Sequence, residues 1–223
     1  MRQHLTLLIT SFLCGISTAS AGPITYDVTV NTSSISGTTG SLDFNFNPGP
    51  LVTQSADLQI LNFSSDGTLE NCASNVQGFC NAGDVTGTLP GTLTFDNGTG
   101  FNDYFDGFTF GNTLSFAVSL YGPALSAPDG ISTSGSKFAF SMFSDSAGTI
   151  PTLTTDTTDG FAFTTNVNLD GTTSVTNSSS QTGVIPQTSG VPEPRGIALS
   201  VVALMLVAVF RKRRTLAHAS IRD

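Results

Sequence analysis

Short stretches in which every second residue is apolar recur along the chain between residues 24 and 169. A period of two is typical of β-strands that pack one face on a core and leave the other face in solvent. No stretch between residues 22 and 190 shows the 3.6-residue apolar stripe of an amphipathic helix. The alternating apolar positions are Ile24, Tyr26, Val28 and Val30; Leu42, Phe44 and Phe46; Leu114, Phe116, Val118 and Leu120; Phe138, Phe140 and Met142; and Phe161, Phe163, Val167 and Leu169.

Clusters of glycine, proline, asparagine and aspartate separate these stretches, as in 47–50, 96–98 and 127–130. Such residues favour turns because they accept left-handed backbone or fix φ. With shorter strand candidates at 58–63, 92–95 and 105–110, the pattern predicts eight to eleven strands. We therefore expect an all-β fold that consists of a single β-sandwich over residues 22–171, with the jelly roll as one candidate topology. Most phenylalanines should fill its core.

Residues 172–190 are rich in Ser, Thr, Asn and Gln and carry almost no charge. This composition is typical of a flexible spacer, and we interpret the stretch as a linker that follows the sandwich.

The first 21 residues have the composition of a secretory signal peptide. Arg2 supplies a positive start, residues 5–15 are largely apolar, and Ala19, Ser20 and Ala21 offer a small-residue cleavage site before Gly22. We expect this segment to direct export and then to be removed by signal peptidase.

The C-terminal end has three parts in a fixed order. Val191, Pro192, Glu193 and Pro194 form an extended stretch, because the prolines fix φ and remove two N–H donors. The apolar run 196–210 follows; as a helix its 15 residues span about 22 Å, a short transmembrane segment. A cationic stop comes next, and residues 215–223 form a short cytoplasmic tail. The stop consists of Arg211, Lys212, Arg213 and Arg214.

This order of motif, apolar helix and basic cluster resembles the PEP-CTERM sorting signal of Gram-negative bacteria, over residues 191–214. The resemblance implies that an integral membrane exosortase recognises the signal and cleaves near Pro192-Glu193-Pro194. It also implies transient anchoring in the inner membrane, followed by placement in the cell envelope, at the outer surface or outside the cell. The alternative is a single-pass C-terminal anchor that is never cut, since hydropathy alone does not separate the two.

Three stretches of the exported part resemble a family of β-rich exported proteins that carry the same signal and have no established activity. They are residues 24–30, 119–123 and 159–163. This resemblance implies a sandwich and gives no site residues.

The exported part is strongly acidic. The chain has 16 acidic residues, of which Glu193 and Asp223 lie outside residues 22–191, and Lys137 is the only lysine or arginine inside that range. The formal net charge of residues 22–191 is therefore about −13, which repels phosphate backbones and excludes nucleic acid as a partner. The same charge suits solubility and attracts divalent cations.

Cys72 and Cys80 are the two cysteines that remain after removal of the signal peptide. In an exported protein an even pair favours a disulfide, so we predict a structural bridge between them.

Candidate chemistry is sparse. Residues 22–191 contain no histidine, which excludes Ser-His-Asp, Cys-His and His-ligated zinc sites. No cofactor-binding motif is present. The loop-rich stretch 96–106 offers oxygen ligands for calcium from Asp96, Asp103 and Asp106, although its spacing is not that of an EF-hand and ordinary turn aspartates explain it as well.

The sequence thus indicates an exported, non-catalytic envelope or extracellular-matrix protein with a structural or adhesive role; the sorting signal links it to exopolysaccharide and biofilm. One alternative is a secreted, lectin-like carbohydrate-binding module, although tryptophan is absent and tyrosine scarce. A second is a glycan hydrolase that uses two carboxylates.

Overall fold

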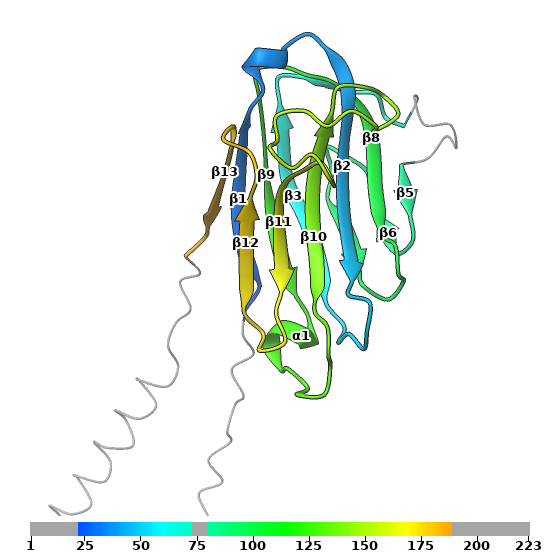
Figure 1. Cartoon of the computed structure of the whole chain (residues 1–223), viewed down its shortest axis with the longest axis vertical. Coiled ribbons are helices and arrows are strands. Elements are labelled where there is room, and N and C mark those ends of the chain that lie inside the picture. The colour runs from blue at the N-terminus through cyan, green and yellow to red at the C-terminus, as the bar shows by residue number, and fades with distance from the viewer. Residues whose placement is uncertain (1–21, 73–79, 189–223) are drawn as a thin grey trace, which may run out of the picture. The chain divides into compact units, whose positions relative to one another are not determined.

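The computed structural model describes residues 22–72 and 80–188, and this part of the chain is mostly β-strand (Figure 1). Only two short helices interrupt the described strands. In chain order the elements are β1 (Ile24–Asn31), the 3-10 helix η1 (Ser33–Ile35), β2 (Thr39–Pro48), β3 (Asp57–Ser65), β4 (Thr68–Leu69), β5 (Asn81–Ala82), β6 (Val85–Thr86), β7 (Leu93–Asp96), β8 (Asp103–Thr109), β9 (Thr113–Tyr121), α1 (Pro123–Ser126), β10 (Ser136–Phe143), β11 (Phe161–Val167), β12 (Thr173–Asn177) and β13 (Thr182–Pro186).

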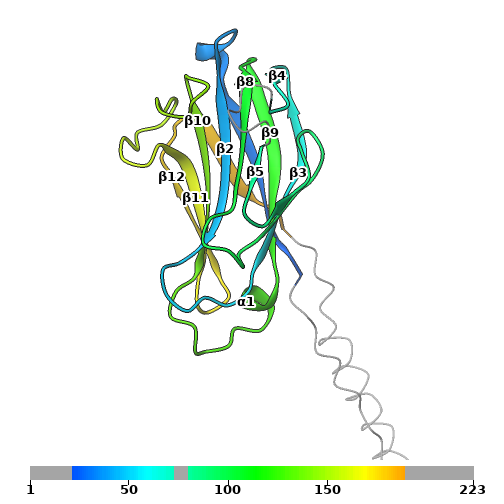
Figure 2. The same ribbon diagram turned by 90° about the vertical axis from the view of Figure 1, so that its right-hand side faces the viewer.

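The strands form two antiparallel sheets that lie face to face, which confirms the predicted all-β sandwich (Figure 2). The six-stranded sheet has the order β13-β1-β9-β3-β7-β6. The seven-stranded sheet has the order β12-β11-β10-β2-β8-β4, and β5 also pairs with β8. Of the thirteen strands in the described ranges, β4, β5 and β6 have two residues each, which explains why the sequence pattern predicted fewer.

The predicted apolar alternation builds the core between the sheets. Phe44 and Phe46 of β2 and Phe138 and Phe140 of β10 have no exposed surface. Phe116 of β9 crosses from the opposite sheet, with its ring centroid 5.2 Å from that of Phe44 and 5.0 Å from that of Phe140. Aromatic rings therefore join the two layers at the centre of the sandwich.

Phe161 is an exception to the predicted alternation. In the pairing of β10 with β11, Phe140 lies opposite Phe163 but Ser141 lies opposite Phe161, so β11 contains one extra residue, Ala162. A β-bulge of this kind changes the face to which the following side chain points. Phe161 is therefore half-buried on the outer face, and its assignment to the core is wrong. Leu169, also predicted as a core position, lies beyond β11 and is 50% exposed.

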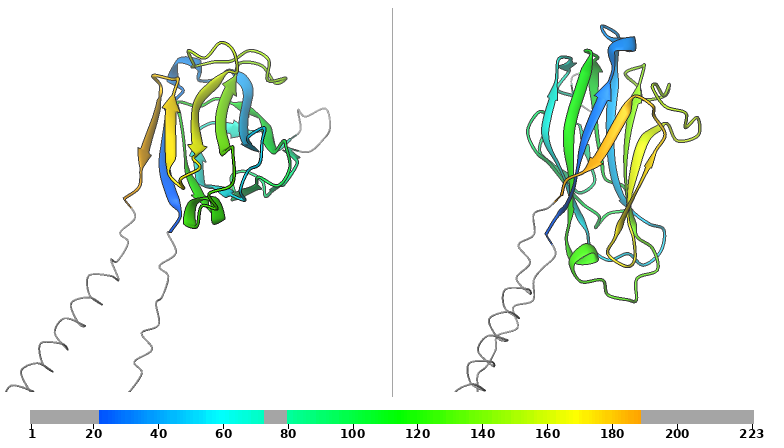
Figure 3. Two further views of the ribbon diagram at one scale, coloured as in Figure 1. Left: turned by 60° about the horizontal axis from the view of Figure 1, so that its bottom comes forward. Right: turned by 90° about the vertical axis from the view of Figure 1, so that its left-hand side faces the viewer.

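The predicted flexible linker at 172–190 is also wrong for most of its length. Residues 173–177 form β12 on β11, and residues 182–186 form β13 on β1. The two strands lie side by side at one side of the sandwich, one in each sheet (Figures 1 and 3). The hydroxyls of Tyr26 and Thr173, 2.6 Å apart, add a link between β1 and β12. The sandwich thus extends to Pro186.

The segment 144–160, between β10 and β11, covers part of the outer face of the seven-stranded sheet. Ser41 of β2 donates a hydrogen bond of 2.9 Å to the carbonyl of Asp145. Gly148 lies so close to Phe105 of β8 that a Cβ there would be 2.7 Å from the ring. Pro151 forms an antiparallel bridge with Phe143. The outer face is consequently covered at one end and open at the other.

Candidate functional site

A hollow of about 400 Å³ lies on the open part of this outer face. Strand β2 and the turn after it form one side, and β10 and β11 form the other. The residues that line it are Asn45, Asn47, Pro48, Gly49, Pro50, Lys137, Ala139 and Phe161. We call this the β2–β10 hollow.

Strand register explains why these side chains meet. On β2 the core takes Leu42, Phe44 and Phe46, so Asn45 and Asn47 point outward. In the antiparallel pairing of β2 with β10, Asn47 lies opposite Lys137 and Asn45 lies opposite Ala139. Small Ala139 leaves space between the longer side chains, and the hollow forms above it.

The bulge in β11 adds the aromatic side chain of the hollow. Because Phe161 is turned outward, its ring lies beside Lys137, whose Nζ is 5.7 Å from the ring centroid. This is the separation of a cation–π contact. Among residues 22–72 and 80–188 the structure gives the Lys137 ammonium no carboxylate within salt-bridge distance. The only cation between residues 22 and 191 therefore points into the hollow with an aromatic ring as its neighbour.

A pair of carboxyl groups adjoins the hollow. Asp43 precedes Asn45 on the same outer face of β2, and Asp103 of β8 lies opposite Asn45. The Asn45 amide donates a short hydrogen bond to Asp43. Oδ1 of Asp103 is fully buried and has no hydrogen-bond partner among the described residues.

The surroundings of the two aspartates raise the pKa of both. Burial, the negative charge of Asp103 and a hydrogen bond to Asp103 raise the pKa of Asp43 well above its ordinary value. Burial also raises the pKa of Asp103, although the hydrogen bond from Asp43 opposes this rise. Burial and the neighbouring negative charge thus make the protonated form of Asp43 more favourable than it is in a free aspartate.

The three predicted calcium ligands do not form one site. Asp96 ends β7 in the six-stranded sheet, where it accepts a hydrogen bond of 2.7 Å from the Gly98 N–H. Asp103 and Asp106 both belong to β8 of the other sheet, but they are three residues apart and point to opposite faces. The prediction failed because it treated 96–106 as a loop, whereas a strand begins at Asp103.

Asp106 is fully buried, and its carboxylate takes part in hydrogen bonds within the protein. Its carboxylate accepts a hydrogen bond of 2.8 Å from the Cys72 N–H and another of 3.3 Å from the Tyr104 hydroxyl. Tyr104 in turn accepts from the Leu89 N–H at 3.1 Å. Burial raises the pKa of Asp106, and the hydrogen bonds from Cys72 and Tyr104 oppose that rise.

The predicted disulfide is confirmed: Cys72 and Cys80 are bonded, with their Cα atoms 5.2 Å apart. Their sulfur atoms and the Asp106 carboxylate lie within 4.8 Å of one another, the only such group among the residues described. Because disulfide sulfurs are not thiolates, this group is not a metal site of the cysteine type. The bridge instead fixes the chain next to the Asp106 hydrogen bonds.

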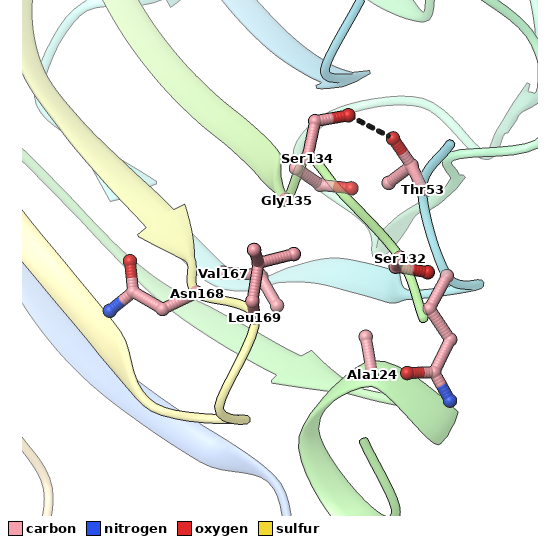
Figure 4. Close-up of a pocket in the computed structure, with 10 residues that line it drawn as sticks. Thr53, Ala124, Ser132, Ser134, Gly135, Val167, Asn168 and Leu169 are labelled. Carbon is pink, nitrogen blue, oxygen red and sulfur yellow. Dashed lines mark hydrogen bonds between the residues drawn. The ribbon is translucent and has the colours of Figure 1, made fainter. Parts of the chain in front are cut away.

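Two other depressions are less suited to a ligand. The first, between Thr53, Ser134 and Leu169 at the α1 end, holds about 10 Å³, roughly one water molecule (Figure 4). Its walls are already joined by the 2.8 Å hydrogen bond between the hydroxyls of Thr53 and Ser134. The second, of about 290 Å³ near Phe63 and Pro90, has no charged side chain in its lining.

Sequence reasoning did not identify the β2–β10 hollow. Its residues come from three separate stretches, and strand register brings them together. One available signal was that Lys137 is the only cation between residues 22 and 191. The other was Phe161, but the bulge that turns it outward depends on tertiary pairing.

The predicted signal peptide, the sorting motif Val191–Pro194, the apolar run 196–210 and the basic cluster 211–214 lie outside the described residues. Within 22–72 and 80–188, no helix has the length and apolar character needed to cross a membrane. Comparisons of the chain with protein-family models, with curated proteins and with solved structures gave no match.

Proposed function

We propose that this chain is exported, held briefly in the inner membrane by residues 196–210, and released by an exosortase that cleaves near Pro192-Glu193-Pro194. The sandwich then serves as a non-catalytic, structural or adhesive component of the envelope or of an exopolysaccharide matrix. The observation that carries the proposal is the ordered C-terminal segment, in which a proline-rich motif, Arg195, an apolar run and four cations follow one another. An N-terminal segment with signal-peptide composition supports export.

Features of the sandwich support a non-catalytic role. The exported part lacks histidine. Its neighbouring acids Asp43 and Asp103 lie on the adjacent strands β2 and β8, and burial raises the pKa of each.

The proposal is tested first by intact mass. The wild-type protein is recovered from the membrane, the outer envelope and the medium, beside a Glu193→Ala, Pro194→Ala double variant. We expect a wild-type mass that starts at Gly22 and ends near Pro192, and a variant that keeps its full C-terminus in the membrane. A wild-type mass that still includes residues 211–223 in every fraction would instead indicate a permanent anchor and contradict release.

The matrix role is tested by location. Cells are washed before and after enzymatic removal of their exopolysaccharide, and the released protein is quantified by immunoblot. We expect the sandwich to leave the cells together with the polysaccharide. A protein that stays with the cells after complete removal of polysaccharide would refute the adhesive role.

The hydrolase alternative is tested by an assay for the release of reducing sugar. A hydrolase would release reducing sugar, and this release would disappear in an Asp43→Asn variant.

A further inference from the structure

We infer that the β2–β10 hollow binds an uncharged sugar unit within a polysaccharide chain. This inference rests on the adhesive function proposed above and assigns it to a defined surface. A volume of about 400 Å³ falls within the range of about 300–1,000 Å³ found for small-ligand sites. The hollow lies on the open part of an outer sheet face, where a polymer can reach it.

The side chains of the hollow match the two kinds of surface that a sugar presents. A pyranose ring has an apolar C–H face, and the half-buried Phe161 ring offers it an apolar platform. The bulge in β11 is what exposes this ring. Without the extra residue, position 161 would point into the core with Phe163.

Sugar hydroxyls both donate and accept hydrogen bonds, and the hollow offers groups for each. The Asn47 carbonyl oxygen already accepts from the Asn102 N–H at 2.6 Å, which leaves its NH₂ group without a partner in the described part of the chain. Asn45 has the opposite arrangement, because its NH₂ group donates to Asp43 and its carbonyl oxygen has no described partner. One free donor and one free acceptor therefore lie two residues apart on β2, with the Lys137 ammonium as a further donor.

Charge selects a neutral ligand. Lys137 is the only charged residue that lines the hollow. The rest of the exported part carries a large excess of carboxylates, whose combined potential repels a polyanion as it approaches. An acidic polysaccharide would have to overcome that repulsion, whereas a neutral one would not.

The test is affinity electrophoresis of the full chain in detergent, in native gels cast with laminarin, dextran or alginate. We expect retardation by at least one neutral glucan and none by alginate. Phe161→Ala should weaken the apparent affinity about three- to tenfold, the loss that one aromatic contact predicts. Lys137→Met should weaken it by a smaller factor, and Phe161→Tyr should restore binding. The matched control is Tyr121→Ala, because Tyr121 is a half-buried aromatic at the end of β9 in the other sheet.

Each contrary result overturns the inference in a different way. Retardation by alginate that depends on Lys137 would show an anionic ligand. If glucans retard the protein and neither Phe161→Ala nor Tyr121→Ala changes that retardation, the binding site lies elsewhere. No retardation of a folded wild-type protein by any of the three polysaccharides would remove the site. The mass and location experiments above do not depend on these variants, so a failure of the hollow is distinguishable from a failure of sorting or matrix attachment.

Discussion

Phe116 should be the side chain whose loss costs the sandwich most. It belongs to the six-stranded sheet and is 3% exposed. Its ring contacts three phenylalanines of the other sheet, with centroids 5.2 Å from Phe44, 5.0 Å from Phe140 and 6.4 Å from Phe163. A Phe116→Ala change removes the ring and leaves a cavity at the point where the two layers meet.

The size of the effect follows from two contributions. Truncation of a buried phenylalanine to alanine costs about 3–5 kcal/mol. The edge-to-face contacts with Phe44 and Phe140 are each worth about 0.5–1.5 kcal/mol beyond area burial, so Phe116→Leu, which keeps most of the volume, should still cost about 1–3 kcal/mol. For a domain of this size, about 3–5 kcal/mol lowers the melting temperature by about 6–20 °C. That loss is a large part of a typical total stability of about 5–15 kcal/mol.

Urea unfolding followed by far-UV circular dichroism measures these differences, under oxidising conditions that preserve the disulfide. The matched control is Phe101→Ala, because Phe101 is 57% exposed and should change stability by less than about 0.5 kcal/mol. The ranking should be Phe116→Ala, then Phe116→Leu, then Phe101→Ala. If Phe116→Ala and Phe101→Ala unfolded at the same urea concentration, the interpretation of Phe116 as the link between the sheets would be wrong.

Three further predictions concern the acid pair, the disulfide and the C-terminal strands. Burial and Asp103 raise the pKa of Asp43 in the folded protein. The contribution of Asp43 to the free energy of unfolding is therefore complete below its unfolded pKa of about 3.9, and it is lost as the pH rises through its folded pKa. Asp43→Asn should therefore raise the melting temperature at pH 7 and change it little below about pH 4; an equal effect at both pH values would contradict the coupling. Replacement of Cys72 and Cys80 by serine should lower the free energy of unfolding by about 2–3 kcal/mol. Urea unfolding of the variant and the wild type, each with and without reductant, measures this loss, since reductant should destabilise only the wild type. A chain that ends at Gly171 loses the pairing of β12 with β11 and of β13 with β1. Its free energy of unfolding should be at least about 3 kcal/mol lower than that of a chain that ends at Thr188. Equal stability of the two chains would instead support the prediction that 172–190 is a linker.

The sequence pattern predicted the fold class and most core positions because half-buried strands have a local signature. Val28, Phe44 and Phe46 each alternate with polar neighbours, and each is buried as expected. Strand β12 has no such signature. Most of its residues are exposed, and it forms because its backbone pairs with β11, so its polar sequence looked like a spacer.

The hollow could not be predicted for a different physical reason. Asn45, Lys137 and Phe161 are far apart in the sequence, and only the register of β2, β10 and β11 brings them together. A shift of one residue in a strand reverses the face of every side chain. The bulge at Ala162 makes that shift within β11, so period-two reasoning placed Phe161 in the core when it belongs to the surface.

The acidic residues between positions 22 and 191 have different roles in the structure. Five aspartates each accept hydrogen bonds from backbone N–H groups two to five residues further on, which is the usual work of aspartate in turns. These residues are Asp96, Asp129, Asp145, Asp156 and Asp170. Turn formation thus explains much of the negative charge without any cation. Asp43 and Asp103 do not fit this explanation, because they lie within strands, where burial raises the pKa of each. The outward-turned Phe161 and Lys137, the only cation between residues 22 and 191, single out this part of the outer face as the surface where binding should be sought.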